Sequence, residues 1–160
     1  MGGMEIIDFR PDLAPVFKAL NEAWITKYFK LEPQDVAVLD DPWGEIIAPG
    51  GAVMFVGPDR ADAASIVGCV ALKAMDDGGF EVAKMAVSDG YKGQGLGRLL
   101  MQACVDRAIA EGGTRLYLET NSALAPALSL YRSFGFKELS GMKRGPGDYE
   151  RVDVWMELKL

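Results

Sequence analysis

The sequence contains no histidine, and cysteine occurs only twice in 160 residues. Without histidine no Ser-His-Asp or Cys-His relay can form, and the commonest nitrogen ligand of zinc is missing. Cys69 and Cys104 lie far apart among apolar neighbours and lack C-x-x-C spacing, which favours buried free thiols over a disulfide framework. We therefore expect no metal site and a reducing, cytoplasmic environment.

Long apolar runs and an excess of positive charge are also absent. No stretch approaches 18 consecutive apolar residues, so a membrane-spanning helix is not expected. A signal peptide is not expected either, because charged side chains interrupt the first 30 residues: Glu5, Asp8, Arg10, Asp12 and Lys18. The net charge of -6 argues against a broad nucleic-acid surface. An anionic ligand would have to be held by local groups.

The remaining composition is that of an ordinary globular protein, with 49% hydrophobic and 25% charged residues. A chain of this length normally forms one domain around one core, so we expect a single domain over residues 1–160. Internal repeats, linkers and low-complexity blocks are not evident in the sequence.

The N-terminal part of the chain predicts one strand and two helices. Residues Met4 to Asp8 form the strand, and a short helix follows Pro33 and ends near Asp40. Between them, an amphipathic helix is expected from Asp12, as its N-cap, to about Tyr28. Its apolar residues recur at helical spacing: Leu13, Val16, Phe17, Leu20 and Trp24.

Three strand candidates come next, at Ala52–Val56, Ser65–Met75 and Phe80–Val87. The short loops between them carry glycine, proline and aspartate, which are typical of turns. We expect these strands to form an antiparallel meander.

The C-terminal half alternates helices with strands. A glycine-rich turn leads into a helix ending near Glu111, with this apolar stripe: Leu96, Leu99, Leu100, Ala103, Cys104 and Ala108. A strand at Leu116–Glu119, a helix at Leu124–Phe134 with Gly135 as its left-handed cap, and a final strand at Val152–Leu160 follow. The pattern predicts a mixed α/β (α+β) fold with one sheet flanked by helices, and a mobile loop over Ser140–Asp148.

The most informative segment joins a strand to a helix through alternate glycines, Lys92-Gly93-Gln94-Gly95-Leu96-Gly97. Such a turn aims several backbone N–H groups at one point and can hold an anion. A Walker A loop is excluded because no Gly-Lys-Ser or Gly-Lys-Thr occurs, and a dinucleotide fingerprint fails because Arg98 stands where its third glycine belongs.

The spacing that fits resembles the R/Q-x-x-G-x-G/A pyrophosphate loop of the GNAT superfamily of acyl-CoA-dependent N-acetyltransferases, with Lys92 replacing the usual Arg or Gln. A second segment resembles the family's L-Y-x-x-x-G-F element on its last helix: Leu130-Tyr131-Arg132-Ser133-Phe134-Gly135-Phe136. The order of elements from about Ser65 to Leu160 also follows the family. Together these motifs imply a GNAT-like sheet that is mostly antiparallel.

The resemblance implies acetyl-CoA as the co-substrate. The main-chain groups of Met85, Ala86 and Val87 would then bind the pantetheine arm. The pyrophosphate would be held by the glycine loop and its flanking cations: Lys92, Gly93, Gln94, Gly95, Leu96, Gly97 and Arg98. Where the family often carries an asparagine this chain has Leu124, and Asn121, one turn upstream, is the candidate in its place.

Two side chains are candidates for the chemistry of acyl transfer to an amine. Glu81 resembles the glutamate base of histone-type members of the superfamily and would act directly or through water, with Glu119 in reserve. Tyr131 would protonate or hydrogen-bond the departing thiolate. The structural alternatives are a solvent-facing or ion-paired Glu81 and a Tyr131 that only anchors its helix.

The acceptor side carries no specific motif. Four aromatic residues could line a cavity or belong to the core: Trp24, Tyr28, Phe29 and Trp43. Tyr149 and Arg151, next to the glycine-bearing loop, are further candidates.

The resemblance predicts an enzyme that transfers acetyl directly from acetyl-CoA to a primary amine of a small molecule. No acyl-cysteine is expected, because Cys104 lies on the apolar stripe of its helix. Alternatives are a non-catalytic acyl-CoA sensor or interaction module and a protein lysine or N-terminal acetyltransferase. Homodimers are common in the superfamily, so one is possible here.

Overall fold

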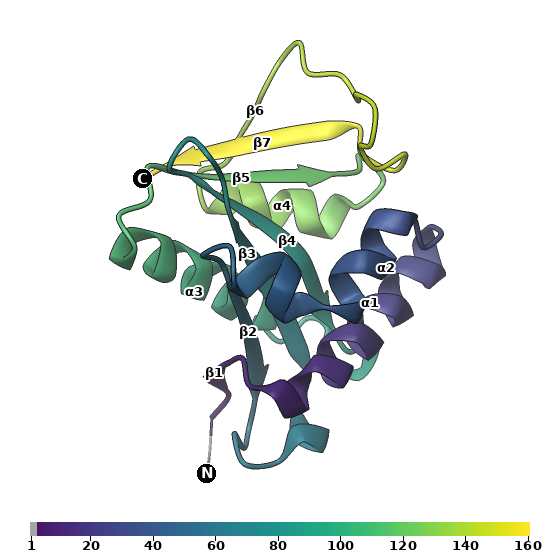
Figure 1. Ribbon diagram of the computed structural model, residues 1–160, viewed down its shortest axis with the longest axis vertical. Helices are drawn as coiled ribbons and strands as arrows, with labels where there is room; N and C mark the ends of the chain where they lie inside the picture. Colours follow the sequence, from purple (N-terminus) through teal and green to yellow (C-terminus); the bar gives the residue numbers. More distant parts are fainter. Residues whose placement is uncertain (1–2) are drawn as a thin grey trace.

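The computed structural model describes residues 3–160 and contains a seven-stranded sheet with the strand order β1-β2-β3-β4-β5-β7-β6 (Figure 1). Neighbouring strands are antiparallel except for β4 and β5, which are parallel. This confirms the predicted mixed, mostly antiparallel sheet. The strands are β1 (Glu5–Asp8), β2 (Ala52–Gly57), β3 (Gly68–Ala74), β4 (Phe80–Val87), β5 (Arg115–Thr120), β6 (Lys137–Glu138) and β7 (Val154–Lys159).

The four predicted helices are present as α1 (Ala14–Tyr28), α2 (Pro33–Asp40), α3 (Leu96–Ala110) and α4 (Ala125–Ser133). Short helical turns occupy Pro11–Leu13, Trp43–Ile47, Ala63–Ser65 and Asp89–Tyr91. The left-handed cap at Gly135 is confirmed by its φ of +98°. Across residues 3–160, no helix combines the length and the apolar character that crossing a bilayer requires.

The predicted N-cap of the first helix is wrong. Asp12 lies within the 3-10 turn and pairs with Arg10 at 2.8 Å, while Leu13 occupies the N-cap position without a side-chain cap. Pro15 lies in the first helical turn instead, where its missing N–H removes one of the donors that would need a cap.

Strand ends also differ from the sequence prediction. The Asp62 carboxylate accepts a hydrogen bond from the Ala64 amide at 3.0 Å and closes a 3-10 turn, so β3 begins at Gly68 and not at Ser65. The final strand begins at Val154 and not at Val152. The two-residue β6 was not predicted, because so short a strand shows no period-2 pattern.

The sheet separates two hydrophobic clusters. On one face, α3 and α4 pack against alternate residues of the central strands, among them Val70, Leu72, Leu118 and Met156. On the other face, α1 and α2 cover residues from β1, β2 and β3, among them Ile7, Phe55 and Cys69. Figure 1 shows α1 and α2 grouped on one side of β4 and α3 on the other, with α4 next to β5.

One residue of the predicted α3 stripe does not belong to the core. Leu99 is 41% exposed, whereas its neighbour Leu100 is fully buried against the sheet. We expect Leu100→Ala to lower the free energy of unfolding by about 2 to 5 kcal/mol, because it removes buried methyl groups and leaves a cavity. The matched control Leu99→Ala should cost less than about 1 kcal/mol. Urea denaturation of both variants tests this, and equal losses would contradict the assignment.

A β-bulge interrupts β4 at Lys84. Cys69 pairs with Ala86 and Ala71 with Ala83, so two residues of β4, Lys84 and Met85, lie opposite a single residue of β3. Lys84 adopts a left-handed φ of +55°, a conformation that costs a non-glycine residue about 1 to 2 kcal/mol. The bulge bends β4 at its middle.

Candidate active site

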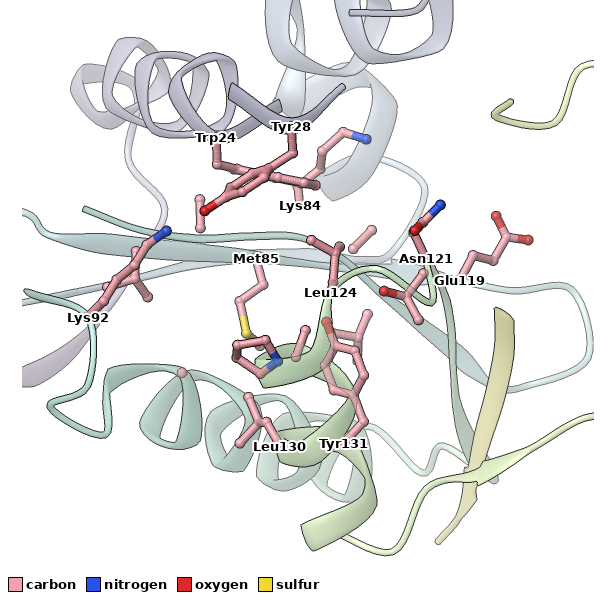
Figure 2. A pocket seen from close by; sticks show the side chains of 18 of the residues that line it. Trp24, Tyr28, Lys84, Met85, Lys92, Glu119, Asn121, Leu124, Leu130 and Tyr131 are labelled. Carbon is pink, nitrogen blue, oxygen red and sulfur yellow. The ribbon is translucent and has the colours of Figure 1, made fainter. Parts of the chain in front are cut away.

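A cavity of about 610 Å³ opens where β4 and β5 separate. The two strands pair only over Phe80–Val82, and beyond that point both contribute residues to the cavity wall. The ends of α1, α3 and α4 complete the lining (Figure 2). The parallel strand pair thus forms the closed end of a cleft in the sheet.

The glycine loop forms one wall of this cavity. Gly93 and Gly95 have φ values of +80° and +77°, and a Cβ added to either would meet no atom within 4 Å. The first turn of a helix leaves its N–H groups without intrahelical partners. Between residues 3 and 160, no backbone carbonyl accepts a hydrogen bond from the amides of residues 93–98. These amides can therefore bind a diphosphate.

The two cations beside the loop both have partners. Lys92 pairs with Asp89 at 3.2 Å and lies 5.8 Å from the ring centre of Tyr28. Arg98 donates to the hydroxyl of Ser133 at 2.7 Å, which holds it against α4. Both line the cavity, as do Gly93, Gly95, Leu96 and Gly97, whereas Gln94 is exposed and lies outside the lining.

The strand side of the cavity is formed by β4 beyond its bulge. Met85, Ala86 and Val87 all line it, as the resemblance implies for a pantetheine-binding strand. Met85 and Val87 face the α3 cluster, while Ala86 packs in the α1 cluster.

Tyr131 extends from α4 into the cavity, with Leu124 beyond the hydroxyl end of its ring (Figure 2). Its ring packs against the ring of Phe136, with ring centres 6.0 Å apart, and this contact restricts the orientation of the Tyr131 side chain. Burial raises the pKa of the Tyr131 hydroxyl to about 12. The group therefore remains a hydrogen-bond donor at neutral pH.

Two carboxylates line the cavity near the paired part of β4 and β5: Glu81 on β4 and Glu119 on β5. Burial, and secondly the negative charge of Glu119, raises the pKa of Glu81 above its ordinary value. Glu119 accepts a hydrogen bond from the Tyr117 hydroxyl at 2.8 Å. Glu81 is thus the carboxyl group whose environment favours taking up a proton.

Asn121 lies in the cavity wall next to Leu124. Its Nδ2 donates to the carbonyl of Arg151 at 2.7 Å, and its Oδ1 accepts from the amide of Ala123 at 2.8 Å. These bonds hold the loop before β7 against the end of β5.

Three of the four aromatic candidates line the cavity: Trp24, Tyr28 and Phe29. The prediction for Trp43 is wrong, because this residue lies on a separate helical turn, is 59% exposed and is not part of the lining.

A buried ionic network beside the cavity was missed by the sequence reasoning. Asp35 of α2 is fully buried and binds both Nη atoms of Arg151, at 2.6 and 2.8 Å, and Nζ of Lys84 at 2.9 Å. Glu32 accepts from Arg151 at 3.3 Å and from the amide of Glu150 at 2.9 Å. Lys84, Arg151 and Tyr149 line the cavity. Glu32 and Asp35 form a capping box on α2, the local signal that could have singled them out.

Neither cysteine is suited to nucleophilic catalysis. Cys69 and Cys104 are both fully buried, and burial raises the pKa of each thiol to about 12. Within the described residues neither forms a disulfide.

The cleft, the glycine loop and the tyrosine helix agree with a family assignment. The model of the acetyltransferase (GNAT) family matches residues 15–136. The chain belongs to this family. GNAT enzymes use acetyl-CoA, which confirms the coenzyme implied by the sequence.

Relatives within the GNAT family have diverse acceptors. An IAA acetyltransferase of Azospirillum brasilense is 36% identical over 100 residues, covering 60% of this chain and 62% of that protein, so the chain spans less than two thirds of this relative. The N-alpha-acetyltransferase RimI of Mycobacterium tuberculosis is 32% identical over 143 residues, covering 83% of this chain and 85% of that protein.

Solved GNAT structures share the whole fold. An acetyltransferase of the GNAT family from Staphylococcus aureus Mu50 has a TM-score of 0.85 at 17% identity, covering 98% of this chain and 99% of that one. The structure of yncA from Salmonella typhimurium with acetyl-CoA has a TM-score of 0.71 at 18% identity, covering 98% and 94%. At these identities the likeness concerns the fold.

Proposed function

We propose that this single-domain protein is an N-acetyltransferase that transfers acetyl from acetyl-CoA directly to the primary amine of a small molecule. One observation carries this proposal: the free amides of the glycine loop, the Tyr131 hydroxyl and the Glu81 carboxyl line one cavity. A coenzyme held by the loop would bring its acyl group between the tyrosine and the carboxylate.

The residues present fit acetyl-CoA. The amides of residues 93–97 and Lys92 would hold the diphosphate, and the main chain of Met85, Ala86 and Val87 would bind the pantetheine arm. When bound, the coenzyme supplies a thioester, so that a C–N bond to the amine forms and the C–S bond breaks.

Glu81 would act as the general base, directly or through one water. An alkyl amine with a pKa near 10.4 is mostly protonated at pH 7, and its deprotonation costs about 4 to 5 kcal/mol. The raised pKa of Glu81 makes this carboxylate a stronger base than an ordinary glutamate, and therefore better able to accept a proton from the ammonium group. Glu119, which faces the same end of the cavity, is the reserve candidate.

Tyr131 would stabilise the departing thiolate by hydrogen bonding. With a phenol pKa of about 12 against about 8.5 for a thiol, full proton transfer is uphill by about 5 kcal/mol. The proton that Glu81 removes from the amine can finally reach the thiolate through solvent, which balances the reaction.

We expect Tyr131→Phe to lower kcat about tenfold, because a hydrogen bond to a charged group contributes about 1.5 to 3 kcal/mol. The affinity for acetyl-CoA should stay within twofold. Cys104→Ala should retain turnover, since direct transfer needs no thiol nucleophile. Steady-state kinetics on both variants test this, and loss of all turnover in folded, coenzyme-binding Cys104→Ala would contradict direct transfer.

The glycine loop permits a matched test of coenzyme binding. Gly93→Asp places a negative charge among the diphosphate-binding amides and should weaken acetyl-CoA binding at least tenfold. Gly112→Asp is the control, because Gly112 has a similar φ of +76° and open space but lies at the far end of α3. Calorimetry measures the affinity of both variants for acetyl-CoA. Equal weakening in the two variants would contradict the proposal that the amides of the glycine loop bind the diphosphate.

The carboxylates at the acceptor end favour an amine over other nucleophiles, because an ammonium group is attracted to Glu81 and Glu119. A protein N-terminus is the second candidate, favoured by the long match to RimI. A panel of small amines and short peptides, assayed by release of free thiol, separates the two. Coenzyme binding without acetylation of any acceptor would support a sensor and overturn the proposed enzyme.

A further inference from the structure

Lys84 combines a left-handed backbone conformation with a buried, ion-paired side chain. Within residues 3–160 it is the only non-glycine residue with a positive φ, at +55°. A conformation so unfavourable for lysine persists only where the surrounding structure holds it in place. The side chain is 5% exposed, and Figure 2 shows it extending away from the neighbouring Met85. The contacts of Lys84 therefore indicate what holds this conformation.

The strongest contact of Lys84 is its ion pair with α2. Its Nζ lies 2.9 Å from Oδ1 of Asp35 and also donates a hydrogen bond to the Tyr149 hydroxyl at 3.1 Å. Asp35 is itself fixed, because its carboxylate accepts a hydrogen bond from the Glu32 amide at 2.9 Å and binds both Nη atoms of Arg151. The end of the Lys84 side chain is thus attached to a carboxylate that is held in one position.

The carbonyl group of Lys84 is held by a separate contact. It accepts a hydrogen bond from the thiol of Cys69 on β3, at 3.7 Å. The sulfur of Cys69 accepts in turn from Nδ2 of Asn21 on α1, at 3.4 Å. A thiol is a weak donor, so this contact contributes less than the ion pair. Residue 84 is thus fixed at two points, its carbonyl group and its ammonium group.

The strand ladder leaves two ways to accommodate the extra residue of β4. The pairs on either side of the bulge fix the register of β4 against β3, so the irregular conformation falls on Lys84 or on Met85. Because the Lys84 ammonium has to reach Asp35, the ion pair selects Lys84. The choice matters because the φ of residue 84 sets the direction of the peptide groups that follow, which belong to three residues that line the cavity: Met85, Ala86 and Val87.

We propose that Asp35 and Lys84 are positioning residues for coenzyme binding, because their ion pair keeps the irregular conformation at residue 84 and so sets the course of the backbone from Met85 to Val87. Neither side chain needs to contact the coenzyme, since both act through the backbone of β4. This inference rests on the proposed function, in which the main chain of Met85, Ala86 and Val87 binds the pantetheine arm.

Two substitutions of Lys84 separate the ion pair from the backbone conformation. Lys84→Met and Lys84→Gly both remove the ammonium group, and Asp35 keeps Arg151 as its partner in each, so the fold should persist. Only glycine adopts a left-handed φ at no steric cost. We expect acetyl-CoA to bind Lys84→Met about tenfold more weakly than the wild type, because the competent conformation becomes a minor one. The affinity of Lys84→Gly should stay within about threefold of wild type. Equal affinities of the two variants, measured by calorimetry, would overturn the inference.

Two further variants test the assignment to Asp35. Lys18→Met removes the lysine of an exposed pair with Asp40 on the same helix and should leave the affinity for acetyl-CoA unchanged. Asp35→Asn introduced into Lys84→Gly should change that affinity less than twofold, because residue 84 no longer depends on the ion pair. A larger loss in this double variant would overturn the inference. If the ion pair only stabilised the fold, urea denaturation would show losses in both Lys84 variants while the folded proteins kept the wild-type affinity.

Backbone NMR separates this inference from the proposed function, because it needs no turnover. The chemical shifts of residues 83–87 report the backbone conformation, and those of residues 85–87 should change in Lys84→Met and stay close to wild type in Lys84→Gly. Unchanged shifts in Lys84→Met would overturn the inference. A wild type that binds acetyl-CoA but acetylates no acceptor would overturn only the proposed function, whereas a wild type that binds no acetyl-CoA would overturn both.

Discussion

Glu81→Gln should lower kcat/KM about a hundredfold at neutral pH, because a general base contributes about 10² or more to such a reaction. In the wild type, the rate should rise with pH as Glu81 ionises, and this rise should begin above the ordinary range for glutamate because its pKa is raised by burial and by Glu119. The variant should lose that limb of the profile. Initial rates measured across pH 4 to 9 test both expectations.

The same substitution should stabilise the fold at neutral pH. A carboxyl whose pKa is raised in the folded state favours folding when protonated and opposes it as pH rises through that pKa. The gain from Glu81→Gln should therefore appear at pH 7 and vanish at acid pH. Glu119→Gln is the matched control, expected to cost only a few-fold in rate. A larger rate loss for Glu119→Gln than for Glu81→Gln would indicate that Glu119, and not Glu81, is the general base.

Asp35→Asn should destabilise the protein by about 3 to 5 kcal/mol, the range typical for removing one partner of a buried charge pair. Asp35 is fully buried, and its loss leaves the Lys84 and Arg151 charges without their shared partner. Asp40→Asn is the control on the same helix, because Asp40 forms an exposed pair with Lys18 at 2.7 Å. That control should cost less than about 1 kcal/mol.

The effect of Asp35→Asn depends on pH with a defined sign. Burial alone would raise the pKa of Asp35, but hydrogen bonds from Arg151 and the charge of Lys84 lower it to about 2. A lowered pKa contributes stability that is present above the unfolded value near 4 and is lost as pH falls toward 2. Chemical denaturation at several pH values should show that the difference in free energy of unfolding between wild type and variant becomes smaller as the pH falls through that range. A difference that stays constant would show that the network is not ionic in origin.

Local patterns were sufficient to predict most of the fold and to select several residues that line one wall of the cavity. Residues 93–97 form a tight loop because Gly93 and Gly95 permit left-handed backbone conformations, and this information lies within one short segment. Tyr131 near the end of α4 and Gly135 just after it were likewise marked by their spacing. Sequence reasoning works where the chain itself brings the functional groups together.

The ionic network beside the cavity could not be predicted, although Arg151 was a candidate, because its groups come from distant segments. Asp35, Lys84 and Arg151 meet only after α2, β4 and the loop before β7 have packed. Trp43 was misjudged for a related reason: an aromatic side chain does not indicate whether the fold turns it toward a cavity or toward solvent. The bulge at Lys84 had no signal either, since lysine is not a residue that favours a positive φ.

The bulge at Lys84 links the cleft to the stability of the fold. Ala83 and Lys84 face the same side of the sheet, so removal of residue 84 would leave every flanking apolar side chain in its present layer. A β4 shortened in this way could run straight and extend its ladder with β5 past Val82, sealing the space between them. The deletion would also take from buried Asp35 one of its two cationic partners, so the residue that opens the cleft also stabilises the fold.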